Sequence, residues 1–335
     1  MFSKRLGIDL GTANSLVYLA GGHGVVLNEP TVVAVSIDDN HVVAVGNEAK
    51  EMLGRTPGNI TALRPMKDGV IADYVMTEAI LAYFINKVCG KTYLFKPEVM
   101  VCVPSGVTQV EKRAVLDATL SAGAKVAYLI EEPLAAAIGA KIPIAQPSGN
   151  MVVDIGGGSA EAAVISLGGV VNHHSVRVGG NKIDEAITFY IRKKFNLLIG
   201  ERSAEEVKLK IGSAIKLNPE TKMEVRGRDN VSGMPRTVEI TSTEITEAIT
   251  NTLIAIIGAV KGVLEQTPPE LASDIIDKGI VMAGGTSMLR NFDKLMTNVT
   301  GVPCHVAEEP LLCTVRGTGI AIENIDLYKR SITKK

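Results

Sequence analysis

Two short segments of the chain combine an aspartate with a turn of small residues between two apolar runs. Asp9 precedes the turn at residues 11–14, and Asp154 precedes the glycine-rich turn at residues 156–159. Each pattern predicts a β-hairpin with little side-chain bulk at its tip, so that backbone N–H groups can reach an anion, commonly phosphate. Because a carboxylate repels phosphate, each aspartate would act through a bound Mg²⁺ and its waters. The segments therefore predict a site for a phosphate chain and its metal ion.

Two better-known phosphate-binding motifs do not fit these segments. The dinucleotide fingerprint needs a third glycine that opens a helix, whereas Glu161 stands at that position and a strand pattern follows. The P-loop ends in Gly-Lys-Thr, as residues 90–92 do, but Ile85 stands where its first glycine belongs and a helical pattern precedes it. Both motifs are rejected.

The likeness of the two hairpins indicates an internal duplication. One glycine-rich hairpin alone would be interpreted as an ordinary turn, but two of the same design favour a protein whose two halves clamp phosphates between them. The pattern of strand, turn and helix also occurs in both parts of the chain. Residues 99–103 predict a buried strand followed by a helix from about 108 to 121, and residues 279–286 predict a strand that opens a helix through Met296.

The remaining elements follow from periodicity and turn residues. Alternating positions within 25–46 predict short strands, and residues 64–69 predict a loop that leads into a helix with apolar positions through Val88. A further helix carries residues 131–140. Residues 180–245 differ in character and predict a small inserted α+β unit, with a helix at 204–217 and strands at 223–225 and 238–240. Residues 29–75 play the same part in the first half.

Composition limits the class of protein. A chain of 335 residues has room for two domains, and 46% hydrophobic with 21% charged residues is typical of a soluble globular protein. The net charge of −1 and scattered basic residues argue against a nucleic-acid partner. The four cysteines lack metal-ligand spacing, which favours reduced thiols. The first strand begins within a few residues, so we expect no targeting segment, and the longest apolar run, 253–260, is expected to be too short to span a bilayer.

Five longer motifs carry a resemblance to a known family. The chain resembles the MreB family, the bacterial members of the actin/Hsp70/sugar-kinase superfamily, from Gly7 to about Ile325. The resemblance lies in residues 9–14, 27–34, 64–73, 130–137 and 267–271.

The resemblance implies an α/β, actin-like ATPase fold with duplicated RNase H-like domains, two inserted subdomains and a central nucleotide cleft. It implies a weak ATPase, with ATP or ADP and Mg²⁺ in the cleft, that polymerises with copies of itself into paired protofilaments. Such filaments lie in the cytoplasm on the anionic inner face of the cell membrane and determine cell shape with proteins of cell-wall elongation. The implied subdomains are IA (1–28, 76–142 and 317–335), IB (29–75), IIA (143–178 and 246–316) and IIB (179–245).

The resemblance also assigns roles to single residues. Glu132 would orient the attacking water with help from the Ser159 hydroxyl, although a carboxylate just before a proline is also typical of a helix start. Asp9 and Asp154 would hold Mg²⁺, mainly through water. The remaining nucleotide-binding residues would be Gly11, Thr12, Ala13, Asn14, Gly156, Gly157, Gly158, Glu205, Lys208, Gly284, Gly285 and Thr286. For Glu205 and Lys208 the alternative is an exposed ion pair one helical turn apart.

The chain departs from the family pattern at several of these positions. The family has Thr-Thr where this chain has Ser159-Ala160, threonine in place of Ser15, and glycine in place of Thr286. Ser159 keeps the hydroxyl but loses the methyl group that restricts its rotamers. Thr286 is expected to place a Cβ beside the adenine. These departures predict nucleotide binding more firmly than an ordinary hydrolysis rate.

A hydrophobic loop at residues 91–96 carries Tyr93, Leu94 and Phe95 between lysines. These residues would either start a strand in the core or form an exposed wedge that enters an anionic membrane. The resemblance favours the wedge, although residues 1–5 are too short to add an amphipathic helix.

Two other functions were weighed against a cytoskeletal polymer. A sugar or acetate-type kinase of the same superfamily would need a base aimed at a substrate hydroxyl and larger insertions, for which no segment is evident. A chaperone of the Hsp70 type would need a peptide-binding domain, which this chain is not expected to have.

Overall fold

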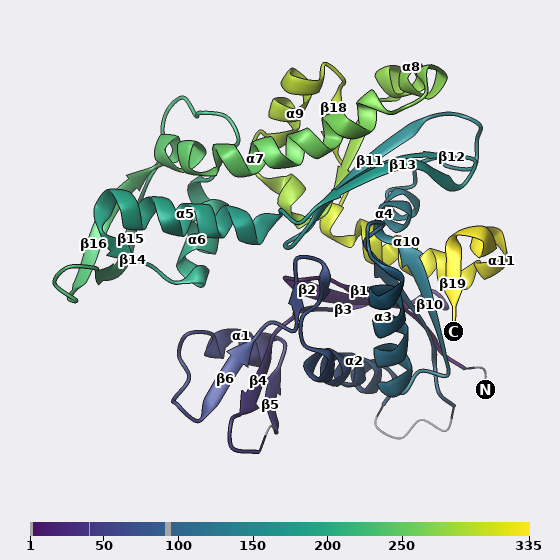
Figure 1. The fold of residues 1–335 in the computed structure, drawn as a ribbon, viewed down its shortest axis with the longest axis horizontal. Coiled ribbons are helices and arrows are strands. Elements are labelled where there is room, and N and C mark those ends of the chain that lie inside the picture. Colours follow the sequence, from purple (N-terminus) through teal and green to yellow (C-terminus); the bar gives the residue numbers. More distant parts are fainter. Residues whose placement is uncertain (1–2, 40, 91–94) are drawn as a thin grey trace.

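The computed structural model describes residues 3–39, 41–90 and 95–335, and it consists of two halves built on separate sheets (Figure 1). The first half contains a six-stranded sheet in the order β19-β10-β9-β1-β2-β3, and the second half contains a five-stranded sheet in the order β13-β12-β11-β17-β18. The chain begins in the first half, crosses to the second, and returns to end in the first.

Apolar strands buried on both faces form the centre of the first sheet. β1 (Arg5–Leu10) pairs parallel with β9 (Glu98–Val103), which pairs parallel with β10 (Val126–Glu131). Continuous apolar runs are typical of such doubly covered parallel strands. The antiparallel strands β2 (Asn14–Leu19) and β3 (Gly24–Pro30) extend one edge, and β19 (Ile332–Lys334) pairs antiparallel with β10 at the other.

Helices cover both faces of this sheet. α2 (Tyr74–Cys89) and α3 (Gln109–Ser121) pack against the side chains of Leu6 and Ile8. The Asp73 side chain caps α2 by accepting the N–H of Met76, and a capping box starts α3. The opposite face packs on α4 (Glu132–Gly139) and α10 (Cys313–Glu323).

The second sheet repeats this plan. β11 (Asn150–Ile155), β12 (Ala160–Ser166) and β13 (Gly169–Val176) form an antiparallel meander, and β17 (Ile280–Ala283) and β18 (Cys304–Val306) continue it in parallel. One face packs on α7 (Ser242–Glu265), and the other shares a core with α4 and α10. Two further helices, α8 (Pro269–Lys278) and α9 (Phe292–Thr300), complete this half.

Among the described residues, α7 is the one helix long and apolar enough to cross a membrane. The sequence analysis, which counted only uninterrupted apolar residues, did not expect such a helix. Its buried side chains, including Ile249, Leu253 and Ile256, belong to the core of the second half. The core helix of a globular protein meets the same criteria of length and composition.

Each half carries a smaller sheet at the same end of the molecule (Figure 1). In the first half these elements are β4 (Val33–Ser36), β5 (Val42–Val45), α1 (Asn47–Met52) and β6 (Ile60–Leu63). In the second they are α5 (Gly180–Phe195), β14 (Leu197–Leu198), α6 (Glu201–Ile211), β15 (Lys222–Asp229) and β16 (Pro235–Thr241). The boundaries assigned to the four subdomains stay a prediction.

Three local predictions were wrong. The helix expected at 204–217 ends at Ile211, because Gly212 has extended backbone. The segment after β17 is not one helix: the short 3₁₀ helix η1 (Gly285–Met288) precedes α9, and Asn291 between them is left-handed with φ 60°. The loop expected at 64–69 contains a small hairpin, β7 (Met66–Lys67) and β8 (Val70–Ile71), whose two-residue turn has positive φ at both positions.

The two crossings of the chain between the halves run through a pair of closely packed helices. α4 precedes the first crossing, α10 follows the second, and Figure 1 shows the pair between the two sheets. A Cβ at Gly139 would lie 1.8 Å from the carbonyl oxygen of Cys313, and a Cβ at Gly317 would lie 1.7 Å from that of Ala135. Only glycine fits at these two positions, so the helix backbones touch.

Candidate functional site

A single cleft between the two halves brings together all the residues predicted for the phosphate, metal and nucleoside sites. Both hairpin tips, the start of α4, one face of α6 and the turn after β17 line it. The predicted residues along its wall are Asp9, Gly11, Thr12, Ala13, Asn14, Glu132, Asp154, Gly156, Gly157, Gly158, Ser159, Glu205, Lys208, Gly284, Gly285 and Thr286.

The tips of the two hairpins touch each other. In β1–β2 the last cross-strand pair is Leu10 with Ser15, and in β11–β12 it is Ile155 with Ala160. A Cβ at Gly157 would lie 2.6 Å from the Cβ of Ala13, and one at Gly158 would lie 2.3 Å from Thr12 Oγ1. None of the tip glycines has a φ between +20° and +160°. Gly157 and Gly158 are therefore needed for close contact between the tips and not for unusual backbone angles.

A third turn, between β7 and β8, closes against both tips. The Gly69 N–H donates a hydrogen bond of 3.0 Å to Thr12 Oγ1, and a Cβ at Gly69 would lie 3.0 Å from Ser159 Oγ. The sequence analysis placed this turn in a loop and gave it no part in the site. The dipeptide Asp68-Gly69, which favours a tight hairpin turn, was the available signal.

The two aspartates lie behind the tips, and each accepts a hydrogen bond from a buried side chain. The Cys102 thiol lies 3.3 Å from Asp9 Oδ1, and the Thr314 hydroxyl donates to Asp154 Oδ2 at 2.7 Å. Burial raises the pKa of Asp9 to about 7, with a further contribution from Asp154 that the thiol opposes. Burial raises the pKa of Asp154 to about 6, against the Thr314 hydrogen bond.

These carboxylates fit a hydrated divalent cation. They supply hard oxygen ligands from both halves, and two acids whose pKa is raised by burial would gain from a nearby cation. In the described part of the chain, no cluster of three or more His, Cys, Asp or Glu side chains could hold a metal ion directly. A metal bound mostly through water and phosphate needs no such cluster.

Glu132 and Ser159 lie in the same cleft on opposite halves. Glu132 is the first residue of α4, followed by Pro133 in the first turn, and it is half-buried. Burial raises the pKa of Glu132 well above its usual value, and the charges of Glu161, Asp9 and Asp154 add to this effect. Ser159 closes the β11–β12 tip, where the Gly156 N–H donates to its carbonyl oxygen at 2.9 Å.

Glu161 is a buried carboxylate that the sequence analysis missed. It lies on β12, directly across from Asp154, and Glu161 Oε2 accepts the N–H of Ser105 at 3.1 Å. Burial raises its pKa to about 7. The signal was available, because Glu161 is the one charged residue in an apolar strand, but the residue was used only to reject the dinucleotide motif.

The part of the cleft predicted to hold the nucleoside is built around two glycines and Thr286. Gly284 has φ +80°, and a Cβ there would lie 2.4 Å from Asp154 Oδ1. The Thr286 hydroxyl donates to the carbonyl oxygen of Gly156 at 2.7 Å. The threonine side chain thus joins the 3₁₀ turn to the tip of the β11–β12 hairpin, a contact that the sequence pattern does not predict.

Glu205 and Lys208 on α6 line the cleft without pairing with each other. Lys208 Nζ lies 2.9 Å from Asp184 Oδ2 on α5, and Glu205 lies 3.2 Å from Lys50 of the first half. Nearby, Arg64 of the first half pairs with Glu201 at 2.7 Å. The exposed ion pair between Glu205 and Lys208, weighed as an alternative, is not formed, and α6 instead links the two small sheets.

The structure describes only residues 95 and 96 of the hydrophobic loop at 91–96. Tyr93 and Leu94 lie outside the described residues, and Phe95 is 59% exposed. The predicted membrane contact of this loop stays a prediction.

The sequence and the fold both match known proteins. The family model for MreB/Mbl protein matches residues 3–330. The cell shape-determining protein MreB of Escherichia coli (strain K12) is 53% identical over 98% of this chain and 96% of its own length. The cell shape-determining protein Mbl of Bacillus cereus is 50% identical over 99% of this chain and 100% of its own length.

Solved structures agree with this assignment. MreB5 of Spiroplasma citri bound to AMPPNP superimposes with a TM-score of 0.92 at 38% identity, covering 98% of this chain and 99% of that one. The same protein bound to ADP gives a TM-score of 0.91. The α/β, actin-like fold expected from the sequence is confirmed by these matches. By its sequence, its fold and the residues gathered in its cleft, this chain belongs to the MreB/Mbl family.

Proposed function

We propose that this protein is a bacterial actin that binds ATP with Mg²⁺ in the cleft, hydrolyses it slowly, and assembles into filaments at the inner face of the cell membrane to determine cell shape. The observation that carries the proposal is the meeting of the two hairpin tips from opposite halves, with one aspartate behind each. The AMPPNP- and ADP-bound structures of MreB5 and the names of the curated relatives support it.

In this proposal the backbone of both tips binds the phosphates. The N–H groups of residues 11–14 would approach the β- and γ-phosphates from one half, and those of Gly157 and Gly158 from the other. Gly156 would line the phosphate site without its N–H, which already donates to the Ser159 carbonyl oxygen. Mg²⁺ would neutralise charge on the phosphates, and Asp9 and Asp154 would hold its waters. Thr286, Gly284 and Gly285 would accommodate the adenine, and Glu205 and Lys208 the ribose, after Glu205 exchanges its contact with Lys50.

Hydrolysis requires mainly positioning of the attacking water and stabilisation of charge. Glu132 lies at the start of α4, facing the cleft from the first half, and is proposed to orient that water. Ser159 would assist from the second half. The sugar or acetate-type kinase is not proposed, because the relatives that match along the whole chain are cell shape-determining proteins.

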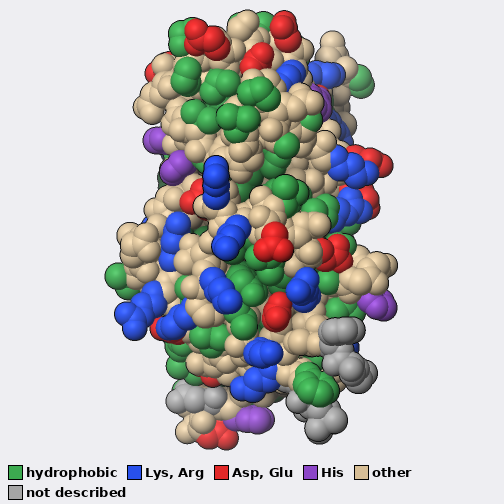
Figure 2. Space-filling model, turned by 90° about the vertical axis from the view of Figure 1, so that its right-hand side faces the viewer, with side chains coloured by type: hydrophobic (Ala, Val, Ile, Leu, Met, Phe, Trp, Pro, Cys, Tyr) green, Lys and Arg blue, Asp and Glu red, His purple; other side chains and the backbone are tan. Residues whose placement is uncertain are grey.

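Attachment to the membrane is part of the proposal and rests on the loop at 91–96. Phe95 is exposed, as a membrane wedge requires. Lysine and arginine side chains spread over the middle and lower part of the end face in Figure 2, which would favour anionic lipid. The proposed partners are further copies of this chain, anionic lipids and proteins of cell-wall elongation.

One experiment tests the parts together. The protein would be sedimented in ATP, ADP and AMPPNP, with and without anionic liposomes, while phosphate release is followed. We expect nucleotide-dependent pelleting that increases with liposomes. Glu132→Ala should lower phosphate release about 100-fold or more, because it removes the group that orients the water, and should leave ATP affinity within about twofold.

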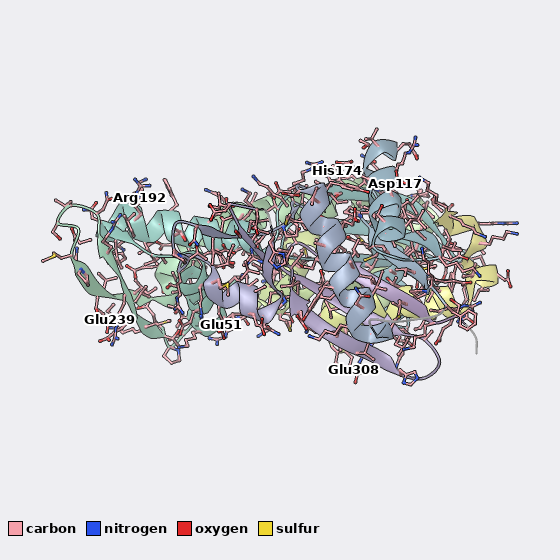
Figure 3. All side chains as sticks on the ribbon, turned by 90° about the horizontal axis from the view of Figure 1, so that it is seen from below. Glu51, Asp117, His174, Arg192, Glu239 and Glu308 are labelled. Carbon is pink, nitrogen blue, oxygen red and sulfur yellow. The ribbon has the colours of Figure 1, made fainter. Side chains whose placement is uncertain are left out.

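The exposed Glu308→Ala serves as the control, because Figure 3 shows this side chain on the molecular periphery. A soluble monomer in every nucleotide would contradict the polymer. Unchanged release in Glu132→Ala would remove Glu132 from the mechanism.

A further inference from the structure

A carboxylate of the second half reaches the backbone of the first half directly behind the cleft. Glu161 is 2% exposed, and its strand neighbours are Asp154 on β11 and Ser175 on β13. Its Oε2 atom accepts the N–H of Ser105, which lies in the turn after β9. The two halves of the molecule are therefore joined here by a hydrogen bond from a backbone N–H to a carboxyl oxygen.

The contact continues to the residue that precedes Glu132. The Ser105 hydroxyl donates to Glu131 Oε2 at 3.2 Å, and Lys112 Nζ of α3 lies 3.5 Å from Glu131 Oε1. Glu131 ends β10 and is the N-cap residue of α4, whose first residue is Glu132. A path of two hydrogen bonds and one peptide bond thus leads from the phosphate-binding sheet of the second half to Glu132 in the first.

Core packing alone does not explain a carboxylate at this position. The other Glu161 oxygen, Oε1, is buried and has no hydrogen-bond partner among the described residues. An unsatisfied buried group costs roughly 1–3 kcal/mol, and apolar residues commonly replace buried charges at no loss of stability. The rest of β12 is alanine, valine and isoleucine up to Ser166, so an apolar side chain would suit the strand.

We propose that Glu161 is a positioning residue for hydrolysis: by holding the Ser105 N–H, it aligns Glu132 with the phosphate hairpin only while the two halves are closed at this contact. The inference rests on the proposed ATP hydrolysis and adds a residue to it. Glu161 acts through Ser105 and Glu131 and needs no contact with the nucleotide. The cost of misalignment is large, because displacement of a reacting group by about 1 Å can slow a reaction about 100-fold.

The test compares Glu161→Ala with Glu161→Gln. Alanine removes the acceptor, and we expect kcat for phosphate release to fall about 10- to 100-fold while KM for ATP changes less than about twofold. Glutamine keeps an oxygen that can accept the Ser105 N–H, so release should stay within about threefold of the unchanged protein. Glu239→Gln is the matched control, because Glu239 lies on β16 in the outer small sheet of the second half (Figure 3), exposed and paired with Lys222.

Two outcomes would overturn the inference. Unchanged release in Glu161→Ala is one, and equal loss in the alanine and glutamine variants is the other, since that would assign the effect to charge. If Glu161→Ala does not fold, Ser105→Ala decides, because it keeps the N–H but removes the link to Glu131. We expect it to slow release about threefold or more at an unchanged melting temperature, and normal release would reject the path.

The same assay separates this inference from the proposed function. If the unchanged protein releases no phosphate, the proposed hydrolysis is contradicted. If Glu132→Ala releases phosphate normally, Glu132 is removed from the mechanism, and with it the residue that Glu161 would align. If Glu132→Ala is inactive while Glu161→Ala is normal, only the role of Glu161 is contradicted.

Discussion

The hairpins β1–β2 and β11–β12 have the same arrangement of two antiparallel strands and a tip of small residues. They come from opposite halves of the molecule, and their tips contact each other. The first tip carries side chains, with Thr12 and Ala13 pointing at its partner, whereas the second tip is made of glycines that leave room for them. Two tips that both carried side chains could not approach this closely. Duplicated elements that come to face each other must diverge, one supplying side chains and the other supplying space.

The aspartates behind the tips have diverged in the same way. Asp9 accepts from the thiol of Cys102, a weak donor, and its pKa is about 7. Asp154 accepts from the hydroxyl of Thr314, and its pKa is about 6. Burial raises both pKa values, and the charge of Asp154 raises that of Asp9 further, whereas the Thr314 hydrogen bond lowers that of Asp154. The second hairpin therefore holds its carboxylate closer to the charged state that a metal ion requires.

The largest expected effect comes from filling the space in the second tip. In Gly158→Ala the new Cβ would lie 2.3 Å from Thr12 Oγ1 and 2.9 Å from the Gly69 nitrogen, so the tips must separate. We expect ATP affinity to fall roughly 30-fold, as overpacking by about 2 kcal/mol would produce. Gly258→Ala on α7 is the control, because a Cβ there would meet no atom within 4 Å and Gly258 does not line the cleft, so its ATP affinity should stay within about twofold. ATP affinity would be measured by titration calorimetry. An equal loss of affinity in both variants would show that the contact between the tips does not determine ATP binding.

A second prediction separates the two aspartates by pH. Both pKa values are raised above 3.8, so the folded protein without ligand binds these protons more tightly than the unfolded chain. Their contribution to stability is complete below the unfolded pKa and is lost as pH rises through the folded pKa. In the unchanged protein, each aspartate should lower the melting temperature by a few degrees as pH rises through its folded pKa. Asp154→Asn should remove the part of this decline near pH 6, and Asp9→Asn the part near pH 7.

Thermal melts from pH 4.5 to 8 would check this order. Saturating Mg²⁺ and ADP should stabilise the unchanged protein more at high pH than at low pH, because the cation favours the ionised carboxylates. A melting temperature that falls over the same pH range in both variants would contradict the difference between the hairpins.

The smallest effect concerns the contact between the second hairpin and the nucleoside end. Thr286→Val keeps the shape of the side chain but removes the hydroxyl that donates to Gly156. A lost hydrogen bond of about 1 kcal/mol should weaken ATP and ADP binding about fivefold while leaving adenosine binding unchanged. Thr286→Ser keeps the donor and is the control. A matching loss for adenosine would place the effect at the base and not at the phosphate hairpin.

Local sequence patterns were enough to predict both hairpins and the starts of α3 and α4. The aspartates, the small turn residues and the capping residue Thr108 each determine structure through near neighbours in the chain. The predicted site residues also line one cleft, because the resemblance to the MreB family links positions that are distant in sequence.

Contacts between distant segments were not predictable in this way. The pairing of Thr286 with Gly156, of Glu161 with Ser105 and of Gly69 with Thr12 each joins residues far apart in the chain. The end of α6 was misplaced because apolar spacing continues past Gly212 while the backbone does not. The propensity of its residues predicts the secondary structure of a segment, but packing against other segments determines where it ends and what it contacts.

The glycine contact between α4 and α10 makes this helix pair the hinge of the molecule. Both covalent links between the halves pass through this helix pair, so any rigid rotation of one half against the other pivots there. In a rotation, displacement grows with distance from the pivot, and the two small sheets lie farthest from it (Figure 1). The ion pairs of Lys50 with Glu205 and Arg64 with Glu201 span that outer rim. A small rotation that leaves the hairpin tips in contact would therefore displace the two small sheets far enough to break both ion pairs.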